Sequence, residues 1–307
     1  MFLIILLYAL FGSSFPISKT VLGFVDPIFY TGIRMFIAGS MLLIYQIGYA
    51  HQHFKFNWKN AWLYGQVILF GIYLTYILRF VGLSTLSSAK TAFLFNFMPF
   101  FSAVYSYFFF KEKLTRQQWA GLVIGFFGFL PILISSSGAE KRIGEFLFIS
   151  WPELAVLAAV ACQSYSWIIM RRLIRDKGYA PSMINGMTML TGGIFALITA
   201  YFFEGPQTME DPGAFLSWLA LVIIISNIVC HNLYAHLLRS YTATFLAFAG
   251  FLGPLFSAFY GWLFRNEIIT WHFYASAIIV FIGLYLFYRH ELQVTGIEKH
   301  HEKPQAS

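Results

Sequence analysis

Apolar segments of about 20 residues recur from one end of this chain to the other, separated by short polar or Pro/Gly-containing stretches. A segment of that length can cross the hydrocarbon core of a membrane as a helix. With 59% hydrophobic and only 11% charged residues, the chain holds more apolar side chains than one soluble core can bury. The sequence therefore predicts an all-α polytopic membrane protein. We expect ten transmembrane helices, at 2–22, 27–48, 61–80, 87–110, 116–134, 150–171, 181–203, 214–238, 241–264 and 270–289.

The distribution of Lys and Arg gives these ten helices a direction. Most of the 20 Lys and Arg residues fall in connections on one side, whereas Lys141, Arg142 and Arg265 fall in connections on the other. Cytoplasmic loops of membrane proteins carry the excess of basic residues. We therefore expect both termini in the cytoplasm. Topology also explains the net charge of +7 without a nucleic acid partner.

The two halves of the chain show a weak similarity at an offset of about 155 residues. At this offset Pro99 falls on Pro254, and Glu112 falls on Glu267. Five helices per half is an odd number, so the second half would cross the membrane in the opposite sense. Inverted repeats of this kind are common in secondary transporters, where they support alternating access. Chance likeness between apolar helices is the alternative explanation.

This pattern predicts two inverted five-helix repeats. Each repeat would form one unit of the fold, and the polar tail after the last helix is expected to be disordered. The predicted boundaries are a first repeat at 1–134, an outer linker at 135–149, a second repeat at 150–289 and a cytoplasmic tail at 290–307.

Two stretches of the sequence resemble a known family. Residues 86–130 combine a small-residue helix start, a mid-helix proline, a glutamate at the cytoplasmic end and a glycine-rich next helix. Residues 241–286 repeat the pattern with Pro254, Glu267 and Gly283. The combination resembles the EamA domain of the drug/metabolite transporter superfamily, in two tandem copies that cover nearly the whole chain. The resemblance implies a ten-helix transporter of the bacterial inner membrane, with a central cavity, that exports or exchanges amino acids and other metabolites.

The first two apolar segments carry a narrower likeness. Their sequences, LYALFGSSFPISK and DPIFYTGIRMFIAGSMLL, are similar to those of the S-adenosylmethionine/S-adenosylhomocysteine transporters of obligate intracellular bacteria. That likeness implies import of the methyl donor from a host and return of the demethylated product. Export of amino acids or of other metabolites is the alternative.

Four cations lie inside the predicted spans, where a charge is costly and marks a functional position. They are Lys19, Arg34, Arg79 and Lys90, and no Asp or Glu lies comparably deep. Arg34 lies about 11 Å into its helix at 1.5 Å per residue, so we expect it to bind a carboxylate or phosphate of the substrate. Lys19 and Lys90 are further candidates, with an equal alternative in which they reach the membrane interface or pair with Asp26, Glu153 and helix C-terminal carbonyls. Arg79 ends its predicted helix, so for this residue we favour that alternative over substrate binding.

Polar residues deep in other spans complete the candidate substrate site. Asn96 lies one turn before Pro99, where the interrupted backbone ladder frees a carbonyl group. Asn185 and His231 lie in the seventh and eighth predicted helices, and the imidazole of His231 could couple transport to protons. Hydrogen bonding between helices is the simpler alternative for all three. Aromatic residues, 20% of the chain, offer faces to a flat or cationic ligand such as adenine or a sulfonium.

Two further patterns predict contacts between helices. Gly121, Gly125 and Gly128 follow the spacing of small residues that lets helices approach closely. Glu112 and Glu267 occupy equivalent places at helix ends, which favours a structural or gating contact over substrate binding.

The sequence carries no motif of an enzyme. A His-Glu-x-x-His sequence, an aspartate-rich diphosphate motif and a phosphate-binding loop are all missing, so we predict no catalytic residue, no metal and no cofactor. The expected partners are a small anionic or zwitterionic substrate and membrane lipid. A protein of another class, a non-transporting scaffold whose buried cations bind lipid headgroups, is the remaining alternative. The oligomeric state is not readable from the sequence.

Overall fold

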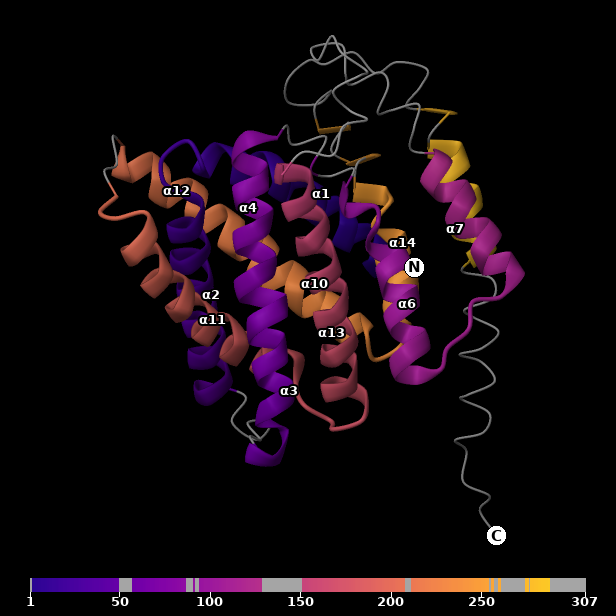
Figure 1. Ribbon diagram of the computed structural model, residues 1–307, viewed down its shortest axis with the longest axis horizontal. Coiled ribbons are helices and arrows are strands. Elements are labelled where there is room, and N and C mark those ends of the chain that lie inside the picture. The colour runs from indigo at the N-terminus through magenta and orange to yellow at the C-terminus, as the bar shows by residue number, and fades with distance from the viewer. Residues whose placement is uncertain are drawn as a thin grey trace.

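All the regular structure of the described residues is helical (Figure 1). The computed structural model describes residues 2–49, 57–86, 91, 94–128, 151–207, 211–253, 255–256, 259–260, 274–275 and 277–287. Within them, six helices are long and apolar enough to cross a membrane: Phe2–Val21, Pro27–Gly48, Trp58–Thr85, Trp151–Arg175, Pro181–Phe203 and Pro212–Leu237. These six correspond to six of the ten predicted segments. The other four predicted segments extend beyond the described residues, which include the shorter apolar helices Met98–Phe110 and Ala277–Phe287.

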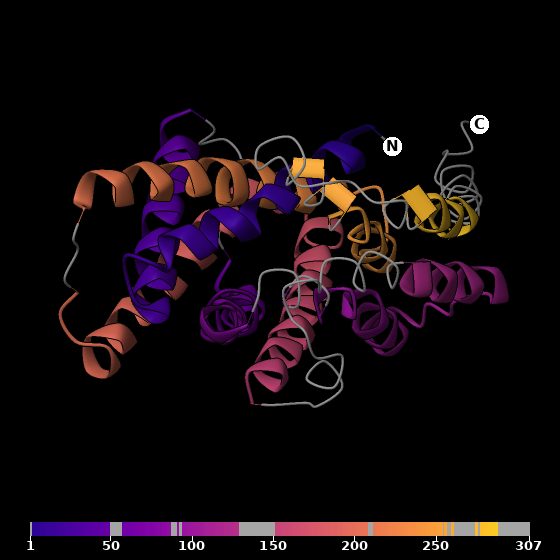
Figure 2. The same ribbon diagram turned by 90° about the horizontal axis from the view of Figure 1, so that it is seen from above.

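The elements follow one another in a simple order along the chain. The first half contains α1 (Phe2–Val21), α2 (Pro27–Gly48), η2 (Trp58–Asn60), α3 (Ala61–Gln66), η3 (Val67–Leu74), α4 (Thr75–Thr85), α6 (Met98–Phe110) and α7 (Arg116–Gly128). The second half contains α10 (Trp151–Arg175), α11 (Pro181–Phe203), α12 (Pro212–Val222), η5 (Ile223–Cys230), α13 (His231–Leu237) and α14 (Ala243–Ala249). Helix α1 lies alongside α12 and η5, so the two halves interlock (Figure 2).

Proline begins three of the long helices. Pro27, Pro181 and Pro212 stand in the first turn of α2, α11 and α12, where the missing N–H would have no helical partner and the fixed φ suits the helix. Asp211 adds a side-chain cap by accepting a hydrogen bond from the Ala214 amide at 2.9 Å. These signals explain why the predicted bounds 27–48 and 181–203 agree with the structure.

Two of the long helices contain π-helical segments at matching places. The segments are η3, which joins α3 to α4, and η5, which joins α12 to α13, and each has eight residues. Their positions differ by about the same 155 residues as the sequence similarity does. Segments of π-helix are rare and are often found at functional sites.

Helices α2 and α11 lie side by side and run in opposite directions (Figure 1). At one end, the Glu204 carboxylate accepts hydrogen bonds from the amides of Ile28 and Phe29, at 2.7 and 2.6 Å. At the other end, Ser182 Oγ donates a hydrogen bond to Gln46 Oε1 at 2.6 Å. These two helices hold corresponding positions in the two predicted repeats, so their antiparallel contact has the sense that inverted repeats require.

Glycines bring the backbones of α2 and α11 together. A Cβ atom on Gly39 would lie 2.2 Å from the Leu190 nitrogen, and one on Gly193 would lie 2.5 Å from the Phe36 nitrogen. We expect Gly39→Ala to force the helices apart and lower the free energy of unfolding by about 1–3 kcal/mol, measured by thermal unfolding in detergent. Gly48→Ala in the same helix is the matched control, because no described atom lies within 4 Å of that Cβ position. Equal losses in the two variants would contradict this explanation.

The close packing predicted for the glycines of α7 is confirmed. A Cβ atom on Gly121 would lie 2.8 Å from the Gly283 carbonyl oxygen, and one on Gly128 would lie 2.5 Å from Ile279 Cγ2. Helix α7 therefore packs directly on the helix at residues 277–287. Gly125 faces another neighbour, since its Cβ would lie 2.6 Å from Cε2 of Phe248 in α14.

The contact predicted for Glu112 is an ion pair. Its Oε1 lies 2.7 Å from Nη2 of Arg171, near the end of α10. The Arg171 guanidinium also lies 4.6 Å from the centre of the Phe110 ring. The ion pair therefore joins the α6–α7 connection to α10, and its gating role stays a prediction. Glu267, the expected counterpart, lies outside the described residues.

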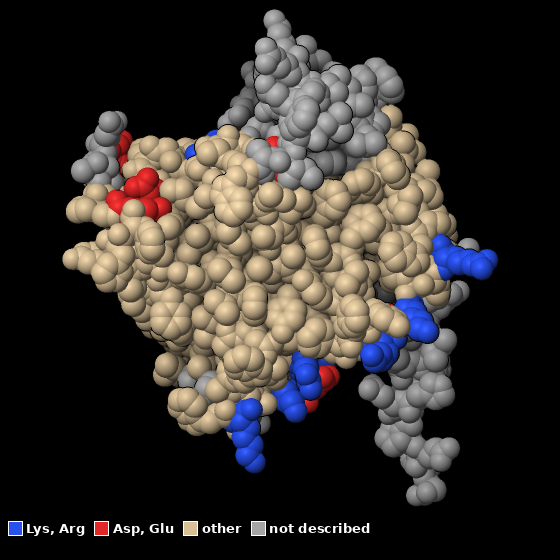
Figure 3. All heavy atoms as spheres, in the orientation of Figure 1, with Lys and Arg blue, Asp and Glu red and all other residues tan. Residues whose placement is uncertain are grey.

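Charged residues on the surface gather at the two ends of the helices. On the face shown in Figure 3, a broad band without charged residues crosses the middle, and most of the visible Lys and Arg lie at or near the lower end of the view, with some acidic atoms beside them. The exposed basic residues in the described part of the chain lie in or beside the connections after α2, between α6 and α7, between α10 and α11, and after α13: Lys59, Lys111, Lys113, Arg116, Arg172, Arg175, Lys177 and Arg239. These are connections that the sequence assigns to the cytoplasm.

Candidate functional site

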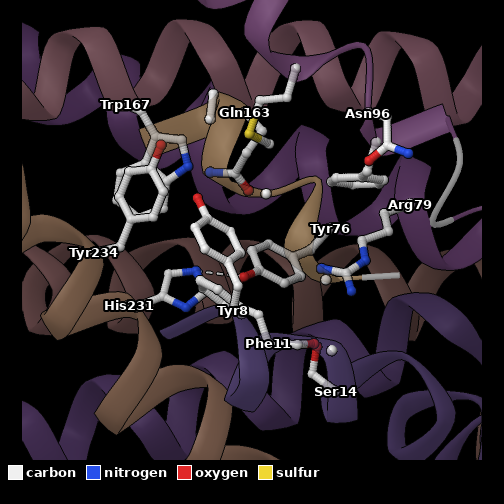
Figure 4. A pocket seen from close by; sticks show the side chains of 16 residues that line it. Tyr8, Phe11, Ser14, Tyr76, Arg79, Asn96, Gln163, Trp167, His231 and Tyr234 are labelled. Carbon is white, nitrogen blue, oxygen red and sulfur yellow. Dashed lines mark hydrogen bonds between the residues drawn. The ribbon is translucent and has the colours of Figure 1, made fainter. Parts of the chain in front are cut away.

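A cavity lies between the two halves of the chain (Figure 4). Its volume, including the open space at its mouth, is about 770 Å³. Its lining comes from α1, α4, α6, α10, α13, α14 and the residues that flank α6 and α14. The described lining residues are Tyr8, Phe11, Gly12, Ser14, Tyr76, Arg79, Phe95, Asn96, Met98, Gln163, Trp167, His231, Tyr234, Ala247, Gly250 and Gly253.

Most of these lining residues fall into pairs that share one sequence offset. Six pairs are separated by 155 residues: Tyr8 with Gln163, Gly12 with Trp167, Tyr76 with His231, Arg79 with Tyr234, Phe95 with Gly250, and Met98 with Gly253. The members of the central pair are hydrogen bonded to each other, with 2.6 Å between Tyr76 Oη and His231 Nε2. Corresponding positions of the two halves thus face one common cavity.

The hydrogen bonds of His231 determine which of its ring nitrogens carries the hydrogen. Nδ1 lies 2.8 Å from the Ser226 carbonyl oxygen, and a carbonyl can only accept, so Nδ1 carries the hydrogen. In the neutral ring Nε2 then accepts the hydrogen bond that the Tyr76 hydroxyl donates. Both ring nitrogens are engaged, and this arrangement favours the structural interpretation of His231 over proton coupling.

One end of the cavity is polar and contains Arg79 and Asn96. The Arg79 side chain is 8% exposed, and its guanidinium lies 5.0 Å from the centre of the Phe95 ring and 5.9 Å from that of Tyr76. Asn96 is 4% exposed, and its Nδ2 has no hydrogen-bond partner in the described part of the chain. An unsatisfied buried donor costs about 1–3 kcal/mol. A ligand oxygen at this end could accept hydrogen bonds from both side chains.

The opposite end of the cavity is aromatic. Trp167 and Tyr234 stack there with 4.0 Å between ring centres and 28° between ring planes. Both side chains are buried, and the Tyr234 hydroxyl finds no hydrogen-bond partner within the described ranges. Figure 4 shows this pair far from Arg79 and Asn96, with Tyr8 between the two ends. This end can take a flat ring that offers one hydrogen-bonding atom.

Arg34, the first candidate from the sequence, is fully buried beside the cavity rather than in its lining. Its Nε donates to Asn227 Oδ1 at 2.6 Å, its Nη2 to Ser226 Oγ at 2.7 Å and its Nη1 to the Tyr30 hydroxyl at 3.2 Å. The guanidinium also lies 5.5 Å from the centre of the Tyr76 ring. Contact between Arg34 and substrate stays a prediction, whereas its hydrogen bonds join α2 to η5.

Lys19 also lies outside the described lining of the cavity. Its ammonium group donates hydrogen bonds to three carbonyl oxygens at the end of α4, those of Leu83, Ser84 and Leu86, at 2.6, 3.4 and 3.1 Å. A cation at a helix C-terminus satisfies carbonyls that have no helical partner and interacts favourably with the helix dipole. The structure therefore gives Lys19 a capping role, and substrate binding by this residue stays a prediction.

The remaining candidates have different positions. Asn96 and His231 line the cavity, as described above. Asn185 is buried outside the described lining, and its Nδ2 donates to Asn232 Oδ1 at 3.1 Å, which is the contact between helices considered as its alternative role. Lys90 lies outside the described residues.

Sequence reasoning missed Arg79 because it misplaced the end of a helix. The predicted segment stops at residue 80, which would put Arg79 at the membrane interface, whereas α4 continues to Thr85. The expectation that Arg79 reaches the interface is therefore corrected, since the side chain is buried in the cavity wall. Trp167 and Tyr234 carried no signal of their own, because most aromatic residues of a membrane protein face lipid or fill the bundle.

Membrane-length helices that surround a cavity built from both halves of the chain define a membrane transporter. Residues 1–134 and 150–289 match the EamA-like transporter family. The chain belongs to this family, within the drug/metabolite transporters that the sequence resembled. It is an integral membrane protein and a transporter, not an enzyme.

Several known proteins are similar to this chain over most of its length. It is 32% identical to the S-adenosylmethionine/S-adenosylhomocysteine transporter of Chlamydia muridarum, over 95% of this chain and 92% of that protein. The transporter of the same name from Chlamydia trachomatis serovar L2 is also 32% identical, over 95% of this chain and 90% of that protein. The transporter YvbV of Bacillus subtilis is 25% identical over 92% of this chain and 90% of that protein. A solved crystal structure shares the fold, with a TM-score of 0.74 at 16% identity, covering 95% of this chain and 96% of that chain.

Proposed function

We propose that this protein exchanges S-adenosylmethionine for S-adenosylhomocysteine across the bacterial inner membrane. The observation that carries the proposal is a cavity that combines a guanidinium, Arg79, with the stacked rings of Trp167 and Tyr234. S-adenosylmethionine has a carboxylate, a sulfonium and an adenine. Arginine binds a carboxylate, and aromatic faces attract both cations and flat rings. The name carried by relatives at 32% identity supports the same substrate pair.

One site can serve both substrates in turn. S-adenosylhomocysteine differs from S-adenosylmethionine by one methyl group and the positive charge on sulfur, so the carboxylate and the adenine are common to both. A cavity that binds these common parts accepts either molecule. The cavity must open to one side of the membrane and then to the other. Exchange follows if the protein makes this change more readily with substrate bound than without it.

The architecture that we propose for this exchange is ten spans in two inverted five-helix repeats, with both termini in the cytoplasm. The antiparallel contact of α2 with α11 and the six pairs of cavity residues at one offset support it. The basic connections at one end of the helices support the orientation. Exchanging the conformations of two related halves would open the shared cavity to one side and then to the other.

Uptake by purified protein in lipid vesicles tests this function. We expect labelled S-adenosylmethionine to enter vesicles loaded with S-adenosylhomocysteine rapidly and with saturation. Empty vesicles and vesicles loaded with an amino acid should take up far less. Uptake that does not depend on the internal S-adenosylhomocysteine would rule out exchange, and no uptake by folded protein would rule out the substrate.

Amino-acid or metabolite export is the second candidate function. Arg79 and Asn96 at one end of the cavity favour it, because they would bind the carboxylate of any amino acid in the same way. Vesicles loaded with labelled amino acids would then release them faster with the protein than without it. A lipid-binding scaffold, the alternative of another class, would show no saturable movement of any solute in these experiments.

A further inference from the structure

We propose that the cavity binds its substrate in one fixed orientation, with the carboxylate at Arg79 and Asn96 and the flat ring at Trp167 and Tyr234. This inference rests on the proposed function. It assigns the residues that determine specificity to two ends of the cavity, each of which recognises a different part of the molecule.

The polar end offers donors to a negatively charged group. The Arg79 guanidinium has only N–H donors, and the Asn96 side chain adds an Nδ2 donor that has no partner among the described residues although the residue is 4% exposed. Two donors from separate segments, one of them charged, suit the two oxygens of a carboxylate. The ammonium group of an amino acid is disfavoured beside Arg79, because the two positive charges repel each other.

The aromatic end suits a purine. Trp167 and Tyr234 line the cavity and stack on each other, so the pair offers aromatic surface to a further flat ring. The Tyr234 hydroxyl, which has no partner in the described part of the chain, can hydrogen bond to a ring nitrogen or to an exocyclic amine. Aromatic rings also lie beside Arg79, but there the guanidinium itself lies over them, 5.0 Å from the centre of Phe95, 5.5 Å from that of Phe80 and 5.9 Å from that of Tyr76.

The relation between the two halves explains why the ends differ. Arg79 and Tyr234 hold corresponding positions, and so do Gly12 and Trp167. At one pair of positions the first half has the Arg79 cation and the second half has the Tyr234 ring. At the other pair the first half has Gly12, which lacks a side chain, and the second half has the large ring of Trp167. The two walls of the cavity are related but carry different side chains. A molecule with two chemically different ends can therefore bind in one direction only.

The middle of the cavity accepts sulfur with or without its methyl group. The rings of Tyr8 and Tyr76 lie between the two ends (Figure 4). Aromatic faces attract a sulfonium by cation–π interaction and contact a neutral thioether favourably as well. The ends therefore set the orientation, and the middle tolerates both members of the substrate pair.

Competition binding to the full-length protein in lipid nanodiscs tests the orientation. The probes are S-adenosylhomocysteine, which has both ends; 5′-methylthioadenosine, which lacks the carboxylate; and methionine, which lacks the purine. We expect Arg79→Gln to weaken the binding of S-adenosylhomocysteine and of methionine at least about tenfold. The binding of 5′-methylthioadenosine should not change. We expect Trp167→Leu to weaken the binding of S-adenosylhomocysteine and of 5′-methylthioadenosine by a similar factor. The binding of methionine should not change.

Conservative variants separate a lost contact from a misfolded protein. Arg79→Lys and Trp167→Phe should each recover part of the lost affinity, because they restore the charge or the ring, whereas a general loss of structure would weaken all three probes together. The orientation is overturned if Arg79→Gln weakens 5′-methylthioadenosine, if Trp167→Leu weakens methionine, or if either variant affects all probes equally.

A second pair of probes distinguishes failure of this inference from failure of the proposed function. Tryptophan carries an amino acid group, with its carboxylate, on an indole ring, whereas indole itself carries no such group. If the wild-type protein binds tryptophan but not S-adenosylhomocysteine, and Arg79→Gln weakens tryptophan but not indole, the orientation stands and the proposed substrate pair is wrong. S-adenosylhomocysteine could be exchanged while Arg79→Gln and Trp167→Leu fail to affect different probes. In that case the function stands and the orientation is wrong. If neither compound binds, both are wrong.

Discussion

An inside-negative membrane potential is expected to drive S-adenosylmethionine into vesicles that contain S-adenosylhomocysteine. Near neutral pH, S-adenosylmethionine carries one net positive charge and S-adenosylhomocysteine carries none, so each exchange moves one charge inward. One charge moved across 100 mV is worth about 2.3 kcal/mol, which corresponds to a shift of about 50-fold in the accumulation ratio. The neutral form of His231, with both ring nitrogens hydrogen bonded, supplies no proton movement to offset that charge.

Potassium gradients with valinomycin set the potential for this measurement. Exchange of labelled for unlabelled S-adenosylhomocysteine moves no net charge and is the internal control, since it should not respond to the potential. If both exchanges ignore the potential, an ion moves with the substrate to compensate its charge. That outcome would refute charge-moving exchange and return proton coupling through His231 to consideration.

Removing Arg34 is expected to damage the fold. Arg34→Leu leaves Asn227, Ser226 and Tyr30 without the donor that now joins them, and all three side chains are buried. Unsatisfied buried groups and the lost packing should lower the free energy of unfolding by roughly 2–5 kcal/mol. Thermal unfolding in detergent measures the loss, and Arg172→Leu, which removes an exposed arginine, is the control whose unfolding temperature should stay near that of the wild type.

Stability and transport, measured together on Arg34 variants, decide between two roles for this residue. The sequence alone predicts that Arg34→Ala abolishes transport in a protein that still folds and inserts. The structure favours a joint loss of stability and transport, because the guanidinium holds α2 against η5. A variant of Arg34 that unfolds at the wild-type temperature yet transports nothing would support direct contact with substrate after all.

The helices could be predicted from the sequence where local signals mark their ends. Proline at the first position of α2 and α11 fixes where each begins, and both predicted ranges agree with the structure. The end of α4 had no such signal, because no proline follows Arg79 before the helix ends at Thr85. The prediction stopped the helix five residues early, and this error gave Arg79 the wrong environment.

The cavity was less predictable because it depends on contacts between distant parts of the chain. The offset of about 155 residues was visible in the sequence, yet it did not show which residues at that spacing face inward. Trp167 and Gly12 share no chemistry, so comparison of the two halves could not single them out. Asn96 was found because a polar side chain next to a proline inside an apolar segment is costly unless it has a role.

The two π-helical segments determine the angle at which the cavity residues face the substrate. Tyr76 follows η3 by two residues, and His231 follows η5 directly. A π-helix forms i→i+5 hydrogen bonds and so holds more residues in each turn than an α-helix, which changes the face on which the following residues lie relative to a continuous α-helix. The segments η3 and η5 therefore help to determine which side chains of α4 and α13 face the cavity.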